Sequence, residues 1–581
     1  MAASRKKKSH PQNPPPQKSQ EELLARAVEE VDAQLRKLSH PVHPTESSES
    51  IESSEPIAPK ESTTHSEHTE MIELDEEMKM AERPKSPEEG GEMQSPEEGG
   101  KMQQALLSGG LVLSSRMERV RGWGMSHGAD MYATRPTTVE QAQSILERAH
   151  EEGVKITLRG SGQSYGDASI GQDRVLLDLT RMRRVLAWDP INGVIDVEPG
   201  VRIVDLWHYT LEDGWWPPVV SGTMRTSLGG GLGVNIHGKN SFKYGTLGDH
   251  VLEIDVLTGD GRLLTCSPSQ HRDIFYAVIG SGGLLGVITR IRLQMKRVYS
   301  GEVLVETFST RSIQEMIDVM EAHLDQDYLV GWVDALAPGF QLGRGTLHVA
   351  RNLKEGEDKR PHHTLKLSYQ ELPEVFLGFV PKSMLWMGLW MFLHRPGMRL
   401  VNTAKFYADR REASRPPYRH SHAGFNFLLD YVPGWQKSYQ PGGLIQYQTF
   451  VPKAAARQVF EQQILLSQKA GIPPFLAVLK KHLPDPFLMS YNVDGYSFAL
   501  DYPVRERNQR RLHRLAHEMT EIVIQHGGRF YFAKDGILTE NEFKRSFPAD
   551  RLRQLRSLKS QLDPSGILTS DMADRIGLLK E

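Results

Sequence analysis

Cysteine is almost absent from this sequence: Cys266 is the single one among 581 residues. A lone cysteine cannot form an internal disulfide or a cysteine-built zinc site, so both are excluded. We interpret Cys266, in the segment LLTCSPS, as a small buried residue at the end of a strand. We expect no metal site elsewhere in the chain.

An excess of charge of one sign is also lacking, since 70 Lys and Arg face 73 Asp and Glu for a net charge of -3. Without a clustered basic face there is no electrostatic case for nucleic-acid binding. No apolar stretch follows the basic residues 5–8, so the N-terminus does not read as a secretory signal. We therefore expect a cytoplasmic protein that is not secreted.

Aromatic residues are missing from residues 1–105, which are rich in Pro, Ser, Glu and Lys. Such a segment cannot bury enough apolar surface to offset its ordering entropy, so we predict a disordered polar tail. One amphipathic helix is a candidate within it, because Ser19 and Glu22 form a capping box before apolar residues at helical spacing.

Helical and strand patterns alternate after the tail. Thr138 is the expected N-cap of a helix that ends at Gly153, and the strand 156–158 follows it. Short strands are predicted at 175–179, 185–188 and 193–197, and a helix at 205–212.

Residues 299–505 differ from this pattern because strand-like apolar runs such as YLVGWVDAL, LIQYQTFV and YSFALDY dominate. We predict an antiparallel sheet there, with helices at 311–324 and 454–470 on one face. A further helix is expected at 508–526, with Asn508 as its N-cap.

The segment 375–393 is almost wholly apolar, but Pro381 and Lys382 interrupt it. The uninterrupted part is shorter than the roughly 20 residues that a spanning helix needs. Its tryptophans and methionines suit a peripheral membrane contact or a cover over an apolar substrate. An ordinary buried helix is the alternative.

Three glycine-rich stretches lie between residues 159 and 286. They read RGSGQSYGD, then SGT followed by GGGLGVNIHGKN, and last GSGGLLG. Glycine lets backbone N–H groups approach an anion closely, as a pyrophosphate requires. None matches the Walker pattern or the βαβ dinucleotide fingerprint. A tight turn could explain any one of them, but three in order beside strand patterns indicate a nucleotide site.

The order of these stretches resembles the FAD-binding domain of the vanillyl-alcohol-oxidase type, the PCMH family, over about residues 120–298. The later segments GGLIQYQTFVP, FLAVLKK, GYSFALDYP and GGRFYFAKD are similar to the decaprenylphosphoryl-ribose oxidase group. The resemblance implies an α+β fold. A two-lobed PCMH-type FAD-binding domain would span 106–298, an antiparallel-sheet substrate domain 299–505, and a segment returning to the FAD domain 506–581.

The resemblance also implies roles for individual residues. The catalytic residues would be Lys534, His237 and Lys480, and the substrate would meet Lys239, Gln446, Gln448, Lys480 and Ser497. A lysine could take the proton of a hydroxyl group or stabilise the reduced flavin, and both roles stay open. FAD would be held by Arg159, Gly160, Ser161, Gly162, Gln163, Ser164, Tyr165, Ser221, Gly222, Thr223, Gly229, Gly230, Gly233, Asn235, His237, Gly282, Gly283, Gly286 and Val287.

Several positions depart from the family pattern. Gln163 stands where covalent members carry a flavin-linking histidine, so we expect non-covalent FAD. Ala499 replaces a frequent cysteine, Ser497 an asparagine, and Phe427 a tyrosine. These departures bear on which sugar the pocket accepts.

The sequence thus favours an FAD-dependent oxidoreductase that oxidises a CH–OH group of a sugar or polyol by hydride transfer to flavin N5. A lipid-linked, polyprenyl-phosphoryl pentose is a candidate substrate, consistent with the apolar segment 375–393. A soluble aldonolactone or alditol oxidase and a non-catalytic flavin-binding scaffold are the alternatives. Oxygen, a quinone and a partner reductase are all open as electron acceptors.

Overall fold

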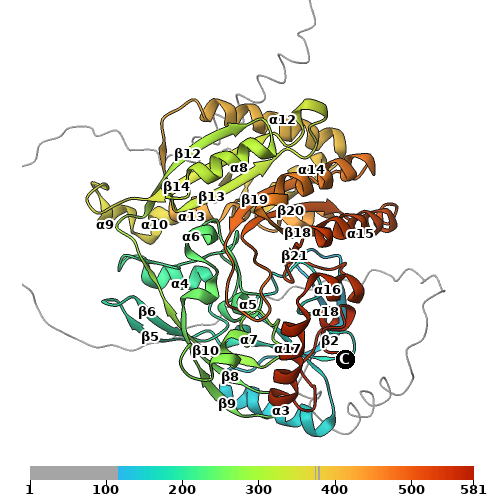
Figure 1. Cartoon of the computed structure of the whole chain (residues 1–581). Helices are drawn as coiled ribbons and strands as arrows, with labels where there is room; N and C mark the ends of the chain where they lie inside the picture. Colours follow the sequence, from blue (N-terminus) through green and yellow to red (C-terminus); the bar gives the residue numbers. More distant parts are fainter. Residues whose placement is uncertain (1–115, 373–374, 377–379, 581) are drawn as a thin grey trace, which may run out of the picture.

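The computed structural model describes residues 116–372, 375–376 and 380–580. The polar tail predicted over 1–105, with its candidate helix, lies outside these residues. The described chain is a mixed α+β fold with several separate sheets, as the sequence predicts (Figure 1).

The first lobe contains a four-stranded sheet in the order β1-β2-β4-β3. Its strands are β1 (Arg116–Arg121), β2 (Gly128–Thr134), β4 (Val175–Asp178) and β3 (Ile156–Arg159). Helix α3 (Val139–Glu152) has the predicted ends, because the Thr138 side chain accepts a hydrogen bond from Gln141 N and Gly153 adopts a φ of 65°. Ala142, Leu146 and Ala149 on this helix pack against Ile156 and Val175.

The second lobe contains a five-stranded antiparallel sheet in the order β5-β6-β10-β8-β9. Cys266 is buried at the end of β9, as expected. The strands are β5 (Val185–Asp189), β6 (Val194–Val197), β10 (Val287–Gln294), β8 (Val251–Leu257) and β9 (Leu263–Cys266). The helices of this lobe include α4 (Ile203–Thr210), α5 (Leu228–Gly233) and α7 (Arg272–Val278).

The largest sheet is eight-stranded and antiparallel, in the order β17-β12-β14-β13-β19-β20-β18-β21. Its last member, β21, comes from beyond residue 505. The strands are β17 (Tyr418–Ser421), β12 (Glu302–Thr310), β14 (Gly345–Asn352), β13 (Tyr328–Val333), β19 (Leu476–His482), β20 (Gly495–Pro503), β18 (Leu444–Pro452) and β21 (Arg529–Phe530).

The two helices predicted for this region lie on one face of the sheet, as expected, and a further helix that was not predicted covers part of the other face. On one face lie α8 (Ile313–Ala322), α14 (Lys453–Lys469) and α15 (Gln509–Gln525), and the ring centroids of Phe460 on α14 and Phe498 on β20 lie 5.0 Å apart. On the other lies α12 (Arg395–Glu412), whose Lys405 sits over the Trp332 ring. Phe498 and Trp332 point to opposite faces, because Trp332 pairs with Val478 on β19 and Phe498 with the next residue, Leu479, and side chains alternate along a strand. Part of the second face that α12 does not cover lines the pocket described below.

The predicted N-cap of α15 is occupied by Asn508, but its side chain does not cap the helix. Its amide instead donates to Pro503 O and accepts from Arg505 N, which holds the preceding turn.

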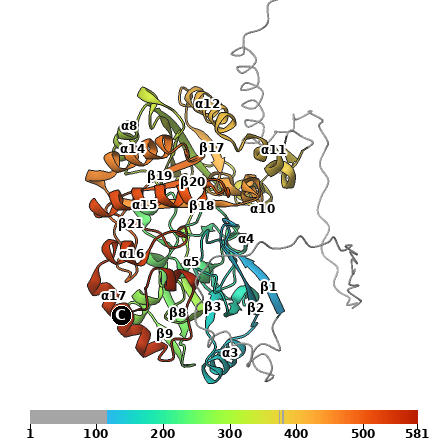
Figure 2. The ribbon, with the colours of Figure 1, turned by 90° about the vertical axis from the view of Figure 1, so that its right-hand side faces the viewer.

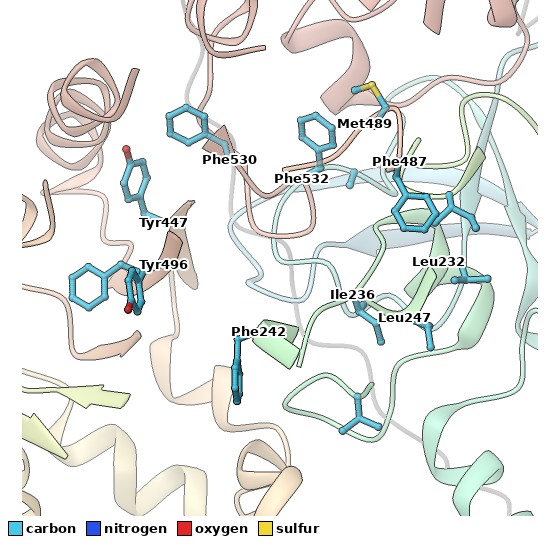
Figure 3. Close-up of a cluster of buried hydrophobic side chains, with 14 of the residues drawn as sticks. Leu232, Ile236, Phe242, Leu247, Tyr447, Phe487, Met489, Tyr496, Phe530 and Phe532 are labelled. Carbon is cyan, nitrogen blue, oxygen red and sulfur yellow. The ribbon is translucent and has the colours of Figure 1, made fainter. Parts of the chain in front are cut away.

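The C-terminal elements lie against the first lobe, beside the blue strands in Figure 1. Ile156 N donates to Ile567 O and Thr569 N donates to Ile156 O, so residues 567–569 extend the edge of β3. The helices here are α16 (Glu540–Ser546), α17 (Ala549–Leu562) and α18 (Asp571–Arg575). Figure 3 shows one hydrophobic cluster running from Leu232 and Leu247 in the second lobe to Tyr447 and Tyr496 on the large sheet.

Within the apolar segment 375–393, the structure describes two short strands, β15 (Val375–Phe376) and β16 (Val380–Pro381), and helix α11 (Leu385–Phe392). None of the helices in the described part of the chain has the length and apolar character needed to cross a bilayer.

Candidate active site

A cavity lies between the glycine-rich loops of the two lobes and the second face of the large sheet. Residues 159–165, 221–223 and 229–230 line its loop side, and β18, β19 and β20 line its sheet side. The third glycine stretch contributes Gly282, Gly283 and Gly286. Loops that are far apart in the sequence therefore meet around one space.

The first two glycine loops are joined by a reciprocal pair of hydrogen bonds. Ser161 N donates to Ser227 Oγ at 3.0 Å, and Ser227 N donates to Ser161 Oγ at 2.9 Å. A Cβ on Gly160 would lie 2.2 Å from Ser227 Oγ, so only glycine allows this approach. The pair fixes both loops along the same wall of the cavity.

The third loop needs glycine for its backbone conformation. Gly283 has a φ of +81°, and a Cβ there would lie 2.8 Å from the Leu158 side chain at the end of β3. Because the loop is pressed onto the first lobe, it closes the cavity next to Arg159. These three backbone-lined loops suit the pyrophosphate and adenosine parts of a dinucleotide.

The opposite wall carries buried cationic side chains. Burial lowers the pKa of Lys480 to about 8. Burial likewise lowers the pKa of Lys534, which the carboxyl group of Asp501 opposes. The Nζ atom of Lys534 lies 3.4 Å from the centroid of the Tyr165 ring, in the first glycine loop. This contact joins the C-terminal part of the chain to a loop that lies more than 300 residues earlier in the sequence.

His237 lies beside this pair of lysines and is neutral. Burial, followed by the charge of Lys480, keeps the pKa of His237 well below its usual range. Its Nε2 atom is 3.0 Å from Gln448 Nε2, while its Nδ1 is buried without a hydrogen-bond partner among the described residues. Lys239 is also buried, and burial lowers its pKa; its ammonium group donates to Phe425 O.

Gln446 and Gln448 alternate on β18 and point to the same side of the sheet. On the neighbouring strand, Ser497 Oγ is hydrogen-bonded to His482 Nε2 at 2.8 Å. Ala499 lines the cavity next to Ser497. The side chain at 499 is thus a methyl group facing the cavity, with no thiol available there.

Asp501, which the sequence analysis missed, lies just outside the cavity lining and acts on it through Gln446 and Lys534. It is fully buried, its Oδ1 accepts from Gln446 Nε2 at 2.5 Å, and its Oδ2 has no hydrogen-bond partner in the described chain. Burial raises the pKa of this carboxyl group. The alternation along β20 could have found it, because Ser497, Ala499 and Asp501 share the face that points toward the cavity.

The cavity gathers nearly all of the residues that the resemblance singled out. Asn235 and Val287 lie outside its lining. Asn235 adopts a φ of 45° and its Oδ1 accepts from Gly248 N, so it holds the second loop from behind. Val287 is buried at the start of β10.

The residues present fit a flavin dinucleotide. Backbone-lined loops offer N–H groups to a pyrophosphate, and the sheet side offers buried polar side chains to an oxidisable ring. Within the described residues no cluster of ligands could hold a metal ion. The fold and the site define the class of FAD-linked oxidoreductases.

The comparisons with known proteins agree with this class. Residues 132–267 match the FAD binding domain family. The decaprenylphosphoryl-beta-D-ribose oxidase of Mycolicibacterium smegmatis is 28% identical over 80% of this chain and 98% of its own length. Mouse L-gulonolactone oxidase is 28% identical over 35% of this chain and 46% of its own length. Cytokinin dehydrogenase 2 of Arabidopsis thaliana is 31% identical over 34% of this chain and 41% of its own length. The family match thus covers residues 132–267, and the likeness to the Mycolicibacterium smegmatis enzyme extends over most of the chain.

Proposed function

We propose that this protein uses non-covalently bound FAD to oxidise a CH–OH group of a sugar or polyol, with a polyprenyl-phosphoryl pentose as the favoured substrate. The observation that carries the proposal is the buried pair Lys480 and Lys534 on the sheet wall, opposite the three glycine loops. FAD, when bound, supplies the hydride acceptor at its N5 atom.

The cofactor would be held by the two loops that the hydrogen bonds between Ser161 and Ser227 join. Gln163 in the first loop offers an amide, whose nitrogen is not a nucleophile and which donates to Ser161 O at 3.0 Å. This supports FAD held without a covalent bond through this position.

Lys534 would take the proton that the substrate hydroxyl loses. Burial lowers its pKa, so that the neutral amine needed for a general base is accessible near neutral pH. Tyr165 limits the positions of Lys534, because the ammonium group lies over its ring. Neutral His237, held by Gln448, would orient the hydroxyl group by a hydrogen bond.

A phosphorylated substrate is favoured by Lys480. No ion pair of this lysine is found among the described residues, and burial is the cause of its lowered pKa. A buried cation without a partner favours an anionic ligand over a neutral one. Lys239, on the same side of the cavity, would assist. The relative in Mycolicibacterium smegmatis is named for a phosphoryl-ribose substrate.

A soluble aldonolactone or alditol oxidase is the second candidate. It is favoured by the relatives named L-gulonolactone oxidase, of which the one from Scyliorhinus torazame is 23% identical over 93% of its own length. A flavin-binding scaffold without turnover is the third. It would leave the buried lysines without a role.

The proposal is tested by anaerobic titration of the purified full-length protein while its visible flavin absorbance is recorded. We expect a short-chain polyprenyl-phosphoryl ribose to bleach the flavin and L-gulonolactone to leave it oxidised. Bleaching by the lactone alone would favour the second candidate, and no bleaching by any sugar, polyol or lactone would favour the scaffold. Acid precipitation should release all colour to the supernatant; colour in the pellet would contradict non-covalent FAD.

A further inference from the structure

Helix α11 presents an unusually apolar surface to the solvent. Trp390 and Met391 are 55% and 65% exposed, and Met384, Met387 and Phe392 beside them are also exposed. Figure 2 shows α11 projecting from the side of the molecule. Large contiguous apolar patches on a soluble protein mark a site of interaction, because exposing them to water costs free energy.

The other face of α11 is firmly attached to the protein. Leu389 and Leu393 belong to the same hydrophobic cluster as Trp435, and Ser438 Oγ donates to Trp386 O at 2.8 Å. The exposed face is therefore held in a fixed orientation by the helix's own packing.

The charges that α11 and the first turns of α12 themselves carry have one sign. The stretch 375–408 contains no Asp or Glu, whereas Arg395 and Arg399 follow α11 on the first turns of α12. Both arginines are exposed, and neither forms an ion pair with another described residue. A surface of tryptophan and methionine with arginines at its edge suits the interface of a bilayer with anionic headgroups.

A buried hydrophobic cluster links α11 to the cavity. The ring centroids of Trp435 and Trp123 lie 5.1 Å apart, and those of Trp123 and Tyr165, in the first glycine loop, lie 4.6 Å apart. Leu428 lines the cavity and is itself 53% exposed. A lipid surface in contact with α11 would thus lie near the part of the cavity that Leu428 lines.

We propose that α11 and the first turns of α12 lie in the interface of an anionic lipid bilayer, with Trp390 and Met391 among the acyl chains and Arg395 and Arg399 at the headgroups. This contact would let an amphiphilic substrate pass from the bilayer into the cavity. The binding itself does not depend on the proposed function, because it requires only the outer surface of α11 and α12.

The test is flotation of the full-length protein with vesicles of phosphatidylcholine, with or without phosphatidylglycerol, in the absence of substrate. We expect binding to the anionic vesicles. Removing an arginine charge near an anionic surface weakens binding about fivefold, so Arg395→Gln with Arg399→Gln should weaken it about 25-fold. Trp390→Ser with Met391→Ser should weaken binding to both kinds of vesicle.

Matched controls keep the number and type of changes the same elsewhere on the surface. Ile191→Ser with Phe340→Ser removes two side chains that are 87% and 96% exposed, and Arg510→Gln with Arg514→Gln removes two exposed charges on α15. These variants should float like the unchanged protein. Flavin bleaching by a soluble substrate should be unchanged in all four variants, so a failure of docking is distinguishable from a failure of the proposed function.

The proposal is overturned if the protein does not float with anionic vesicles, or if the controls weaken binding as much as the α11 variants do. A concentration-dependent dimer that Trp390→Ser with Met391→Ser abolishes would assign the surface to a second copy instead. A photo-crosslink from position 390 to residues 1–115 in the free protein would assign it to the chain's own N-terminal segment.

Discussion

The two walls of the cavity offer different kinds of groups to a ligand. The loop wall uses backbone groups and short hydroxyls, such as the Ser161 and Ser227 pair, and its glycines occur in contiguous stretches. The sheet wall carries the buried ionisable side chains Lys480 and Lys534, from a strand and a turn, and Asp501 lies behind it against Gln446. A backbone wall can bind an anion with little change in protonation, whereas a wall of buried charges makes proton transfer and stability depend on pH.

The comparison is tested most strongly by Lys534→Met. Without the amine, the proton of the substrate hydroxyl has no acceptor, and we expect the rate of flavin reduction to fall about 10³-fold. FAD binding should persist, because the loop wall is intact. Anaerobic stopped-flow absorbance measures the rate, and the flavin spectrum measures occupancy.

Lys481→Met is the matched control for this variant. Lys481 lies next to Lys480 on β19 but pairs with Glu321 on the other face of the sheet, at 2.7 Å. Its loss should leave the rate per bound flavin unchanged. If both variants slow flavin reduction equally, Lys534 has no specific chemical role.

Lys480→Met tests the energetic cost of the sheet wall. The lysine has a pKa of about 8 when folded against a usual 10.5, so its burial costs about 3 kcal/mol below pH 8. Between these values the unfolded chain binds more protons, so the stability of the unchanged apoprotein rises with pH. Urea unfolding of the apoproteins should show the variant more stable at pH 7, with the difference shrinking as the pH approaches 10.5. A less stable variant at pH 7 would contradict this account.

Gly233→Val tests the loop wall. A Cβ at Gly233 meets no atom within 4 Å and the residue lines the cavity, so the new side chain should occupy cofactor space without disturbing the fold. We expect the Kd for FAD to rise about 10- to 100-fold, as measured by flavin fluorescence on titrating the apoprotein. Gly388→Val on α11, where a Cβ also meets nothing within 4 Å, is the control and should bind FAD normally. Equal losses in both variants would indicate general destabilisation.

Asp501→Asn should have the smallest effect. Its carboxyl group raises the pKa of Lys534 against the effect of burial, so removing the charge should lower that pKa further. The rise of kcat/KM with pH should then move to lower pH by about one unit. Glu321→Gln, on the other face of the sheet, should leave the profile in place. If the midpoint stays fixed or moves to higher pH in Asp501→Asn, the charge of Asp501 does not raise the pKa of Lys534.

Local features were the ones that the sequence predicted well. The ends of α3 follow from Thr138 and Gly153, and the three glycine loops stand out by composition alone. Helix α12 and the face that it covers were not predicted, because the strand pattern does not show which face a later helix packs on. Asp501 was missed because its importance depends on Gln446 and Lys534, which are distant in the sequence.

The sequence by itself indicated a nucleotide site, because glycine lets backbone approach a pyrophosphate closely and the three glycine stretches are visible residue by residue. The class of FAD-linked oxidoreductases came from the resemblance of these stretches and the later segments to a known family. Only the tertiary structure decided how the sheet wall works. Lys534 becomes a candidate base because folding buries it over Tyr165 and near Asp501. The pKa of a side chain is set by its desolvation and its neighbours, and both exist only after distant segments have packed together.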